Sequence, residues 1–71
     1  MMILSSIASA AERRAELEIS EALDRVLGRE RRRDVFELVG TETGRPASAR
    51  SALYWMRVNM PTAAGLIDES R

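Results

Sequence analysis

Apolar residues recur at spacings of three and four in the first part of the chain, and this pattern predicts a long helix over residues 4–27. The stripe consists of Ala8, Ala11, Ala15, Ile19, Ala22 and Val26. Gly28 suits the position after the last turn, where a left-handed residue commonly ends a helix. A helix of this length is about 35 Å long, so a small helical core can cover only part of it.

One apolar residue lies off this stripe. Leu17 is placed opposite Ile19, on the otherwise polar face of the predicted helix. The excess helix length and this Leu indicate a homodimer formed through the helix, with contacts expected at Ala15, Leu17, Ile19 and Ala22. The alternative is a single exposed Leu on an overhanging helix, which is common in monomers.

A second helix is predicted over residues 29–39, with Gly40 as its end. A single helix running on through Gly28 would turn the later apolar residues away from the Ile19 face. The expected buried side of the second helix is Val35, Phe36, Leu38 and Val39. The helix opens with four Arg in residues 29–33. They indicate either a contact to phosphate or acidic protein, or a solvated face paired at helical spacings with Glu30, Asp34 and Glu37.

Two prolines bracket a third predicted helix over residues 46–58, and the second of them, Pro61, begins a fourth over residues 61–69. One side of the third helix carries Ala49, Leu53, Met56 and Met60. The other side carries Tyr54, Trp55 and Val58, with Arg50 and Arg57 between the two sides. A helix with two unlike apolar sides is expected to contact something besides its own core.

The length of 71 residues allows one small domain. We therefore expect a single all-α domain over residues 1–71, in which the helix over 4–27 precedes a compact helix-turn-helix-like unit over 29–69. The chain has no Cys and no His, which excludes disulfides, thiolate or imidazole metal ligands, and Cys or His catalysis. Carboxylate pairs such as Glu12 with Glu16 are interpreted as solvated. We expect no enzyme activity, no cofactor and no small-molecule substrate.

The start of the chain, MMILSSIASAAE, lacks the positively charged segment of a signal peptide. No stretch approaches the roughly 20 apolar residues that a membrane span requires. These features predict a cytoplasmic protein without a membrane partner.

The charges are balanced but unevenly distributed. Eleven Arg and no Lys face eleven acidic residues, whereas residues 29–57 hold seven Arg against four acids. Arg makes planar, bidentate contacts to both carboxylates and phosphates. A basic middle segment on a neutral chain is therefore compatible with either an acidic protein or DNA as the partner.

Residues 35–67 resemble the short helix-turn-helix repressors of phages. The resemblance is carried by a helix ending in Gly, a recognition helix with a Leu and Trp pair, and a Met-Pro step into a last helix, at Gly40, Leu53, Trp55, Met60 and Pro61. It implies that the helix over 46–58 enters the major groove of DNA. The residues that would face base edges and phosphates are Arg50, Ser51, Tyr54 and Arg57, with Arg45 and Ser48 reaching the backbone.

The same residues support a second hypothesis, in which the partner is a protein. Trp, Tyr, Met and Arg anchor protein interfaces, so Tyr54, Trp55, Arg57 and Val58 would dock in a groove of a target. The two functions considered are a small phage- or prophage-type DNA-binding transcriptional regulator, and a phage-type accessory protein that inhibits or modulates a host protein such as a transcription factor. In a third interpretation Trp55 packs against the first helix, and neither function uses it.

Overall fold

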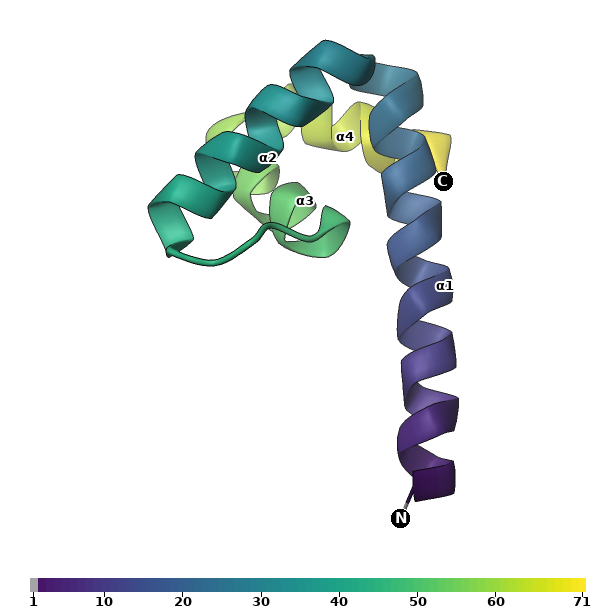
Figure 1. Ribbon diagram of the computed structural model, residues 1–71. Helices are drawn as coiled ribbons and strands as arrows, with labels where there is room; N and C mark the ends of the chain where they lie inside the picture. Colours follow the sequence, from purple (N-terminus) through teal and green to yellow (C-terminus); the bar gives the residue numbers. More distant parts are fainter. Residues whose placement is uncertain (1) are drawn as a thin grey trace.

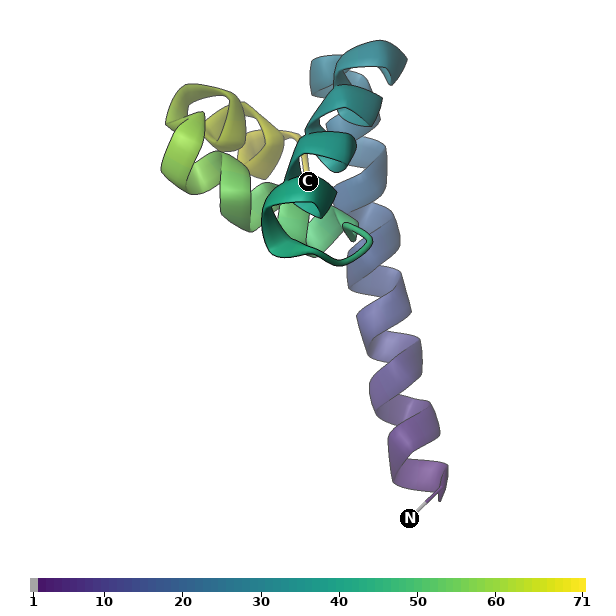
Figure 2. The same ribbon diagram turned by 60° about the vertical axis from the view of Figure 1, so that its left-hand side comes forward.

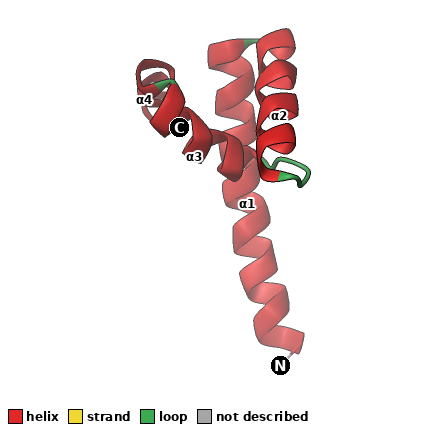
Figure 3. Ribbon diagram, turned by 90° about the vertical axis from the view of Figure 1, so that its left-hand side faces the viewer, coloured by secondary structure: helices red, strands yellow, loops and turns green. Residues whose placement is uncertain are grey.

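The computed structural model describes the backbone of residues 2–71 and the side chains of residues 9–71. Its helices are α1 (Met2–Leu27), α2 (Arg29–Thr43), α3 (Ala49–Asn59) and α4 (Pro61–Ser70), and residues 2–71 contain no strand (Figures 1 and 3). The predicted all-α class, with a long first helix followed by three shorter ones, is confirmed.

The first helix is longer than the unit on which it packs. The C-terminal half of α1 lies against the other three helices, whereas its N-terminal half projects away from them (Figures 1 and 2). Gly28 separates α1 from α2 with a φ of 82°, a conformation that Gly adopts without a steric cost. At the other end of the chain, Arg25 of α1 donates to the hydroxyl and the carbonyl of Ser70 at 2.9 and 2.8 Å, and thereby holds the last turn of α4.

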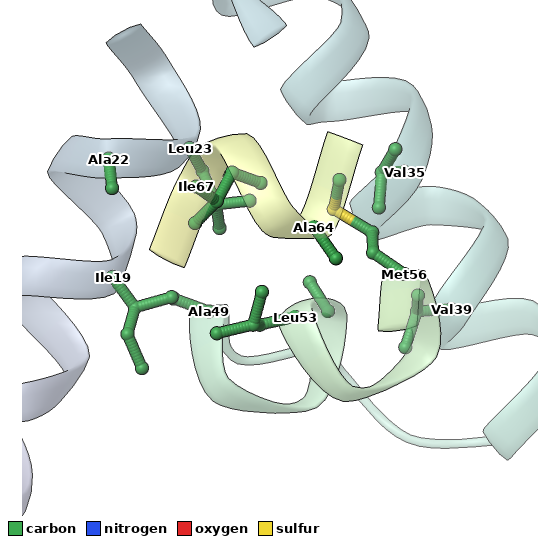
Figure 4. Close-up of a cluster of buried hydrophobic side chains, with 11 residues drawn as sticks. Ile19, Ala22, Leu23, Val35, Val39, Ala49, Leu53, Met56, Ala64 and Ile67 are labelled. Atoms are coloured by element: carbon green, nitrogen blue, oxygen red, sulfur yellow. The ribbon is translucent and has the colours of Figure 1, made fainter. Parts of the chain in front are cut away.

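A single apolar core joins the four helices. Its buried side chains are Ile19, Ala22, Leu23, Val35, Val39, Ala49, Ala52, Leu53, Met56, Ala64 and Ile67. Figure 4 shows α3 bridging the core, with Leu53 facing the α1 side chains and Met56 facing those of α2. Four of the core residues are Ala, and their small side chains let the helix backbones approach closely. Each larger core side chain contributes about 1.5–3 kcal/mol to stability through its burial.

The end of α2 differs from the prediction. The helix runs through Gly40 to Thr43, and Gly44 ends it with a left-handed φ of 71° and an N–H that donates to the Gly40 carbonyl at 2.9 Å. The predicted end at Gly40 was wrong. A Gly within a helix costs only about 0.5–1 kcal/mol relative to Ala, which is too little to end the helix by itself. A Cβ at position 40 would lie 3.4 Å from the Arg45 carbonyl oxygen, at the short end of ordinary van der Waals contact, because the chain returns past the helix there.

The start of α3 also differs from the prediction. The helix begins at Ala49, and the predicted start at Pro46 was wrong. Ser48 caps the helix: its hydroxyl accepts the N–H of Ser51 at 3.1 Å, and the Ser51 hydroxyl accepts the N–H of Ser48 at 2.9 Å. This reciprocal pair is a capping box and sets the helix start more firmly than Pro46 does. The connection from α2 to α3, residues 44–48, is longer than the three- or four-residue turn of a helix-turn-helix.

One core prediction for α2 fails. Val35 and Val39 are buried as predicted, and Phe36 is half-buried, with the Arg32 guanidinium carbon 4.6 Å from the centre of its ring. Leu38 is 45% exposed, so the prediction that it belongs to the core was wrong. It lies beside the helix side occupied by the two valines, at the edge of the covered surface.

Candidate functional site

The side of α3 that faces away from the core is exposed. Tyr54 is 64% and Val58 80% exposed, and Arg50 and Arg57 are exposed beside them. Steps of four, three and one residue place these four side chains on one stripe of the helix. We call Arg50, Tyr54, Arg57 and Val58 the α3 face.

Within the α3 face, Arg57 is held by two neighbours. Its guanidinium donates to the Asp68 carboxylate of α4 at 3.1 Å, and its central carbon lies 5.7 Å from the centre of the Tyr54 ring. Both members of the ion pair are more than a third exposed, so solvent screening leaves the pair with roughly 0–1 kcal/mol. The consequence is orientation: Arg57 and Tyr54 lie against each other before any partner binds.

Trp55 does not belong to the α3 face, in contrast to the prediction. It is half-buried at the edge of the core, and its indole N–H donates to the Glu42 carboxylate of α2. The third interpretation placed it against the first helix, but its hydrogen bond is to α2. Trp55 therefore joins α3 to the end of α2, and only its exposed part is available to a partner.

The first turn of α3 is occupied from within the chain. The Glu16 carboxylate of α1 accepts the N–H of Ala49 and, at 3.2 Å, the N–H of Arg50. Ser51 donates its N–H to Ser48, and the two serines that were predicted to contact DNA form the capping box of the helix. Helix N-termini are ready anion sites because their first N–H groups are unpaired. Here three such groups already have partners, and one partner is a carboxylate.

Sequence reasoning missed Glu16. It was interpreted as a solvated carboxylate, and its half-buried position at the start of a helix 33 residues further on was not anticipated. The only signal was its place one residue from Ala15 on the core side of α1. That signal does not identify the helix that packs there.

The structure separates the other predicted basic contacts from the α3 face. Arg45 is exposed in the α2–α3 connection, where it lines a shallow hollow with Glu37 and Thr41. Arg32 donates to the Ser20 hydroxyl of α1 at 2.7 Å and lies 3.4 Å from the Asp24 carboxylate. Arg32 is therefore paired, but its partner is Asp24 of α1. Among the described residues, the carboxylates expected to pair with the cluster, Glu30, Asp34 and Glu37, form no ion pair.

The predicted dimer residues have different environments. Ile19 is 4% exposed and Ala22 is fully buried in the chain's own core. A second chain has no access to these two in this fold, so their assignment to a dimer surface was wrong. Ala15 is half-buried, and Leu17 is 59% exposed on the opposite side of α1.

A small hollow of about 220 Å³ lies beside the α3 face, between α1, α3 and the end of the chain. Its apolar lining comes from Ala15, Ile19 and Leu53, and its polar lining from Tyr54 and three arginines, Arg50, Arg57 and Arg71. Ile19 and Leu53 are buried whereas the arginines and Tyr54 are exposed, so the apolar residues form the floor and the charged ones the rim.

No family model, curated protein or solved structure matches the chain. Among the described residues, no group of three or more acidic side chains could hold a metal ion, and no helix is long and apolar enough to cross a bilayer. The exposed chemistry of the α3 face consists of an aromatic ring, an aliphatic side chain and two guanidinium groups.

Proposed function

We propose that the chain is a small helical module that binds another protein through the α3 face. The partner would present carboxylates beside an apolar surface. Tyr54 and Val58 supply contiguous exposed apolar area, and Arg50 and Arg57 flank it with groups that bind carboxylates in a bidentate manner. Tyr and Arg are residue types that dominate the binding energy of protein interfaces.

The observation that carries this proposal is the Glu16 carboxylate at the start of α3. If α3 entered the major groove, its first turn would approach the DNA backbone. A phosphate there would meet the negative charge of Glu16 and would find the first N–H groups already bonded. The Glu42 carboxylate, held by Trp55, adds negative charge on the α2 side. A chain with zero net charge also lacks the excess cations that supply non-specific DNA affinity.

A DNA-binding transcriptional regulator is the second candidate, and one observation favours it. Arg50 and Arg57 are separated by two helical turns on the same exposed side of α3, and Tyr54 lies between them. A helix in the major groove reads base edges with side chains in this arrangement. In that case Glu16 would be a local obstacle to binding, which makes its substitution informative.

Binding would itself be the activity of such a module. A protein that covers a surface of its target blocks that surface or changes how the target acts. We therefore propose inhibition or modulation of a target protein as the role, with a transcription factor of a host cell among the targets considered. Association through the exposed Leu17 of α1 would pair two copies and present two α3 faces.

The test compares capture of proteins by the wild type, by Val58→Glu and by a matched control, Leu38→Glu, which introduces the same charge on exposed α2. Both side chains are at least 45% exposed, so the free energy of unfolding of each variant should lie within about 0.5 kcal/mol of the wild-type value. We expect a nuclease-resistant protein partner that the wild type and Leu38→Glu retain and that Val58→Glu loses. Capture that Val58→Glu leaves intact, or that nuclease abolishes, contradicts the proposal.

A further inference from the structure

The hollow beside the α3 face combines a cationic rim with an apolar floor. Its lining includes Arg50 and Arg57 of α3 and Arg71 at the end of the chain. The floor consists of the α1 and α3 side chains that face each other at the edge of the core, Ile19 and Leu53, with Ala15 beside them. A ligand that suits both parts has an anionic head and a short apolar stem.

The charges around the hollow leave one cation in excess. Arg57 and Arg71 share a single oxygen of Asp68, at 3.1 and 3.6 Å. Glu16 accepts backbone N–H groups of α3. It lines a neighbouring hollow with Arg50, Glu12 and Arg13, and the last two of these balance each other in charge. No ion pair of the Arg50 side chain occurs among residues 9–71. Three guanidinium groups therefore face two carboxylates, and each guanidinium carries five N–H donors.

The size of the hollow limits what enters it. At about 220 Å³ it is smaller than the roughly 300–1,000 Å³ of typical small-molecule sites, so it suits one side chain. A singly charged carboxylate matches the excess of one cation. A phosphorylated side chain, which carries about −1.5 to −2 charge, would exceed it and would be repelled by Asp68 and Glu16.

We propose that this hollow is a recognition site for a carboxylate on an apolar stem, as in a glutamate side chain of an acidic protein segment. This rests on the proposed function, because the segment would belong to the protein bound at the α3 face. The carboxylate is bound by Arg50 and Arg57, and the methylene groups of the stem lie over Ile19 and Leu53. Tyr54, already in place beside Arg57, forms the wall between the two arginines.

The test is a titration of the isotope-labelled chain with three blocked tripeptides, acetyl-Leu-Glu-Leu-amide and its Gln and phosphoserine counterparts, followed by NMR. We expect saturable shifts of the backbone and guanidinium signals of Arg50, Arg57 and Arg71 with the Glu peptide. The Gln peptide should bind about tenfold more weakly, because it loses the charge-assisted hydrogen bonds. Tighter binding of the phosphoserine peptide would overturn the assignment to a carboxylate.

Variants separate the hollow from general attraction to arginine. Arg50→Gln should lower the affinity for the Glu peptide about tenfold. Arg33→Gln, at an exposed position of α2, should leave this affinity unchanged. Equal weakening by both variants, or no saturable shift at the three arginines, overturns the proposal. The titration needs no partner protein, so the two proposals fail separately. If the Glu peptide binds but no protein is captured, the proposed function is contradicted. If a protein is captured in a manner that Val58→Glu abolishes but the Glu peptide does not bind, the proposed role of the hollow is contradicted.

Discussion

The Glu16 carboxylate of α1 accepts the backbone N–H of Arg50 at 3.2 Å, across 34 positions of the chain. Together with its bond to the N–H of Ala49, this contact fastens the start of α3 to α1. The start of α3 therefore has a cap from the tertiary structure in addition to the local capping box of Ser48 and Ser51. Glu16 also supplies negative charge at the positive end of the α3 dipole, which stabilises the helix.

Loss of this cap should lower stability. Glu16→Ala removes the acceptor of two N–H groups, and we expect the free energy of unfolding in urea to fall by about 1–2 kcal/mol. Glu18→Ala, at an exposed position of the same helix, is the control and should change it by less than about 0.5 kcal/mol. Equal effects of the two substitutions would show that the Glu16 contact is not a cap in solution.

Core and face positions on α3 should respond differently to truncation. Leu53→Ala removes a buried side chain of the core and should cost about 2–5 kcal/mol. Val58→Ala removes an exposed one, and its cost should stay within about 0.5 kcal/mol. Chemical denaturation of both variants measures the contrast. A cost of more than about 2 kcal/mol for Val58→Ala would mean that this side of α3 is covered in the free protein.

Gly44 and Gly65 have different backbone conformations, so the same substitution to Ala should affect stability in opposite directions at the two positions. Gly44 has a left-handed φ of 71°, so Gly44→Ala should destabilise the protein by about 1–2 kcal/mol. Gly65 is exposed inside α4 with no atom within 4 Å of an added side chain, so Gly65→Ala should raise stability by about 0.4–1 kcal/mol. Thermal unfolding should move the two midpoints in opposite directions. A shift of both in the same direction contradicts the assigned end of α2.

Association through α1 is expected to depend on Leu17. Sedimentation equilibrium at micromolar concentration should give about twice the chain mass of 7.9 kDa. Leu17→Glu should return the monomer, and Leu66→Glu, at an exposed position of α4, should not. If the wild type is monomeric at high concentration, the predicted homodimer is wrong. A dimer that survives Leu17→Glu places the interface elsewhere.

The choice between protein and DNA as partner can be made with duplex DNA alone. We expect no binding of mixed-sequence DNA at about 50 mM salt, where non-specific affinity is strongest. Glu16→Gln removes the charge at the start of α3 and is the variant most able to reveal latent affinity. Binding by the wild type, with log K falling by about 0.9 per log unit of salt for each phosphate contacted, would put the DNA-binding regulator first.

The spacing of apolar residues, with Gly28 and the two prolines as boundaries, predicted the four helices, the long first helix and most of the core. Helical periodicity is a local property, and the residues that face inward repeat every three or four positions whatever they pack against. The same periodicity correctly placed Ala49, Leu53 and Met56 inward and Tyr54 and Val58 outward on α3. The helix ends were less well predicted. Gly and Pro occur at a helix end and also a few residues away from it, so Gly40 and Pro46 did not fix the last residue of α2 or the first residue of α3.

Only the tertiary structure decided how the helices use their remaining side chains. Glu16 became a cap because α3 begins beside it, and Trp55 became half-buried because the end of α2 lies within reach of its indole. Ile19 was assigned by periodicity to both the core and a dimer surface, and the packing of α3 and α4 on α1 assigned it to the core. A helical stripe shows that a residue must be covered, whereas the partner that covers it depends on contacts between segments far apart in the chain.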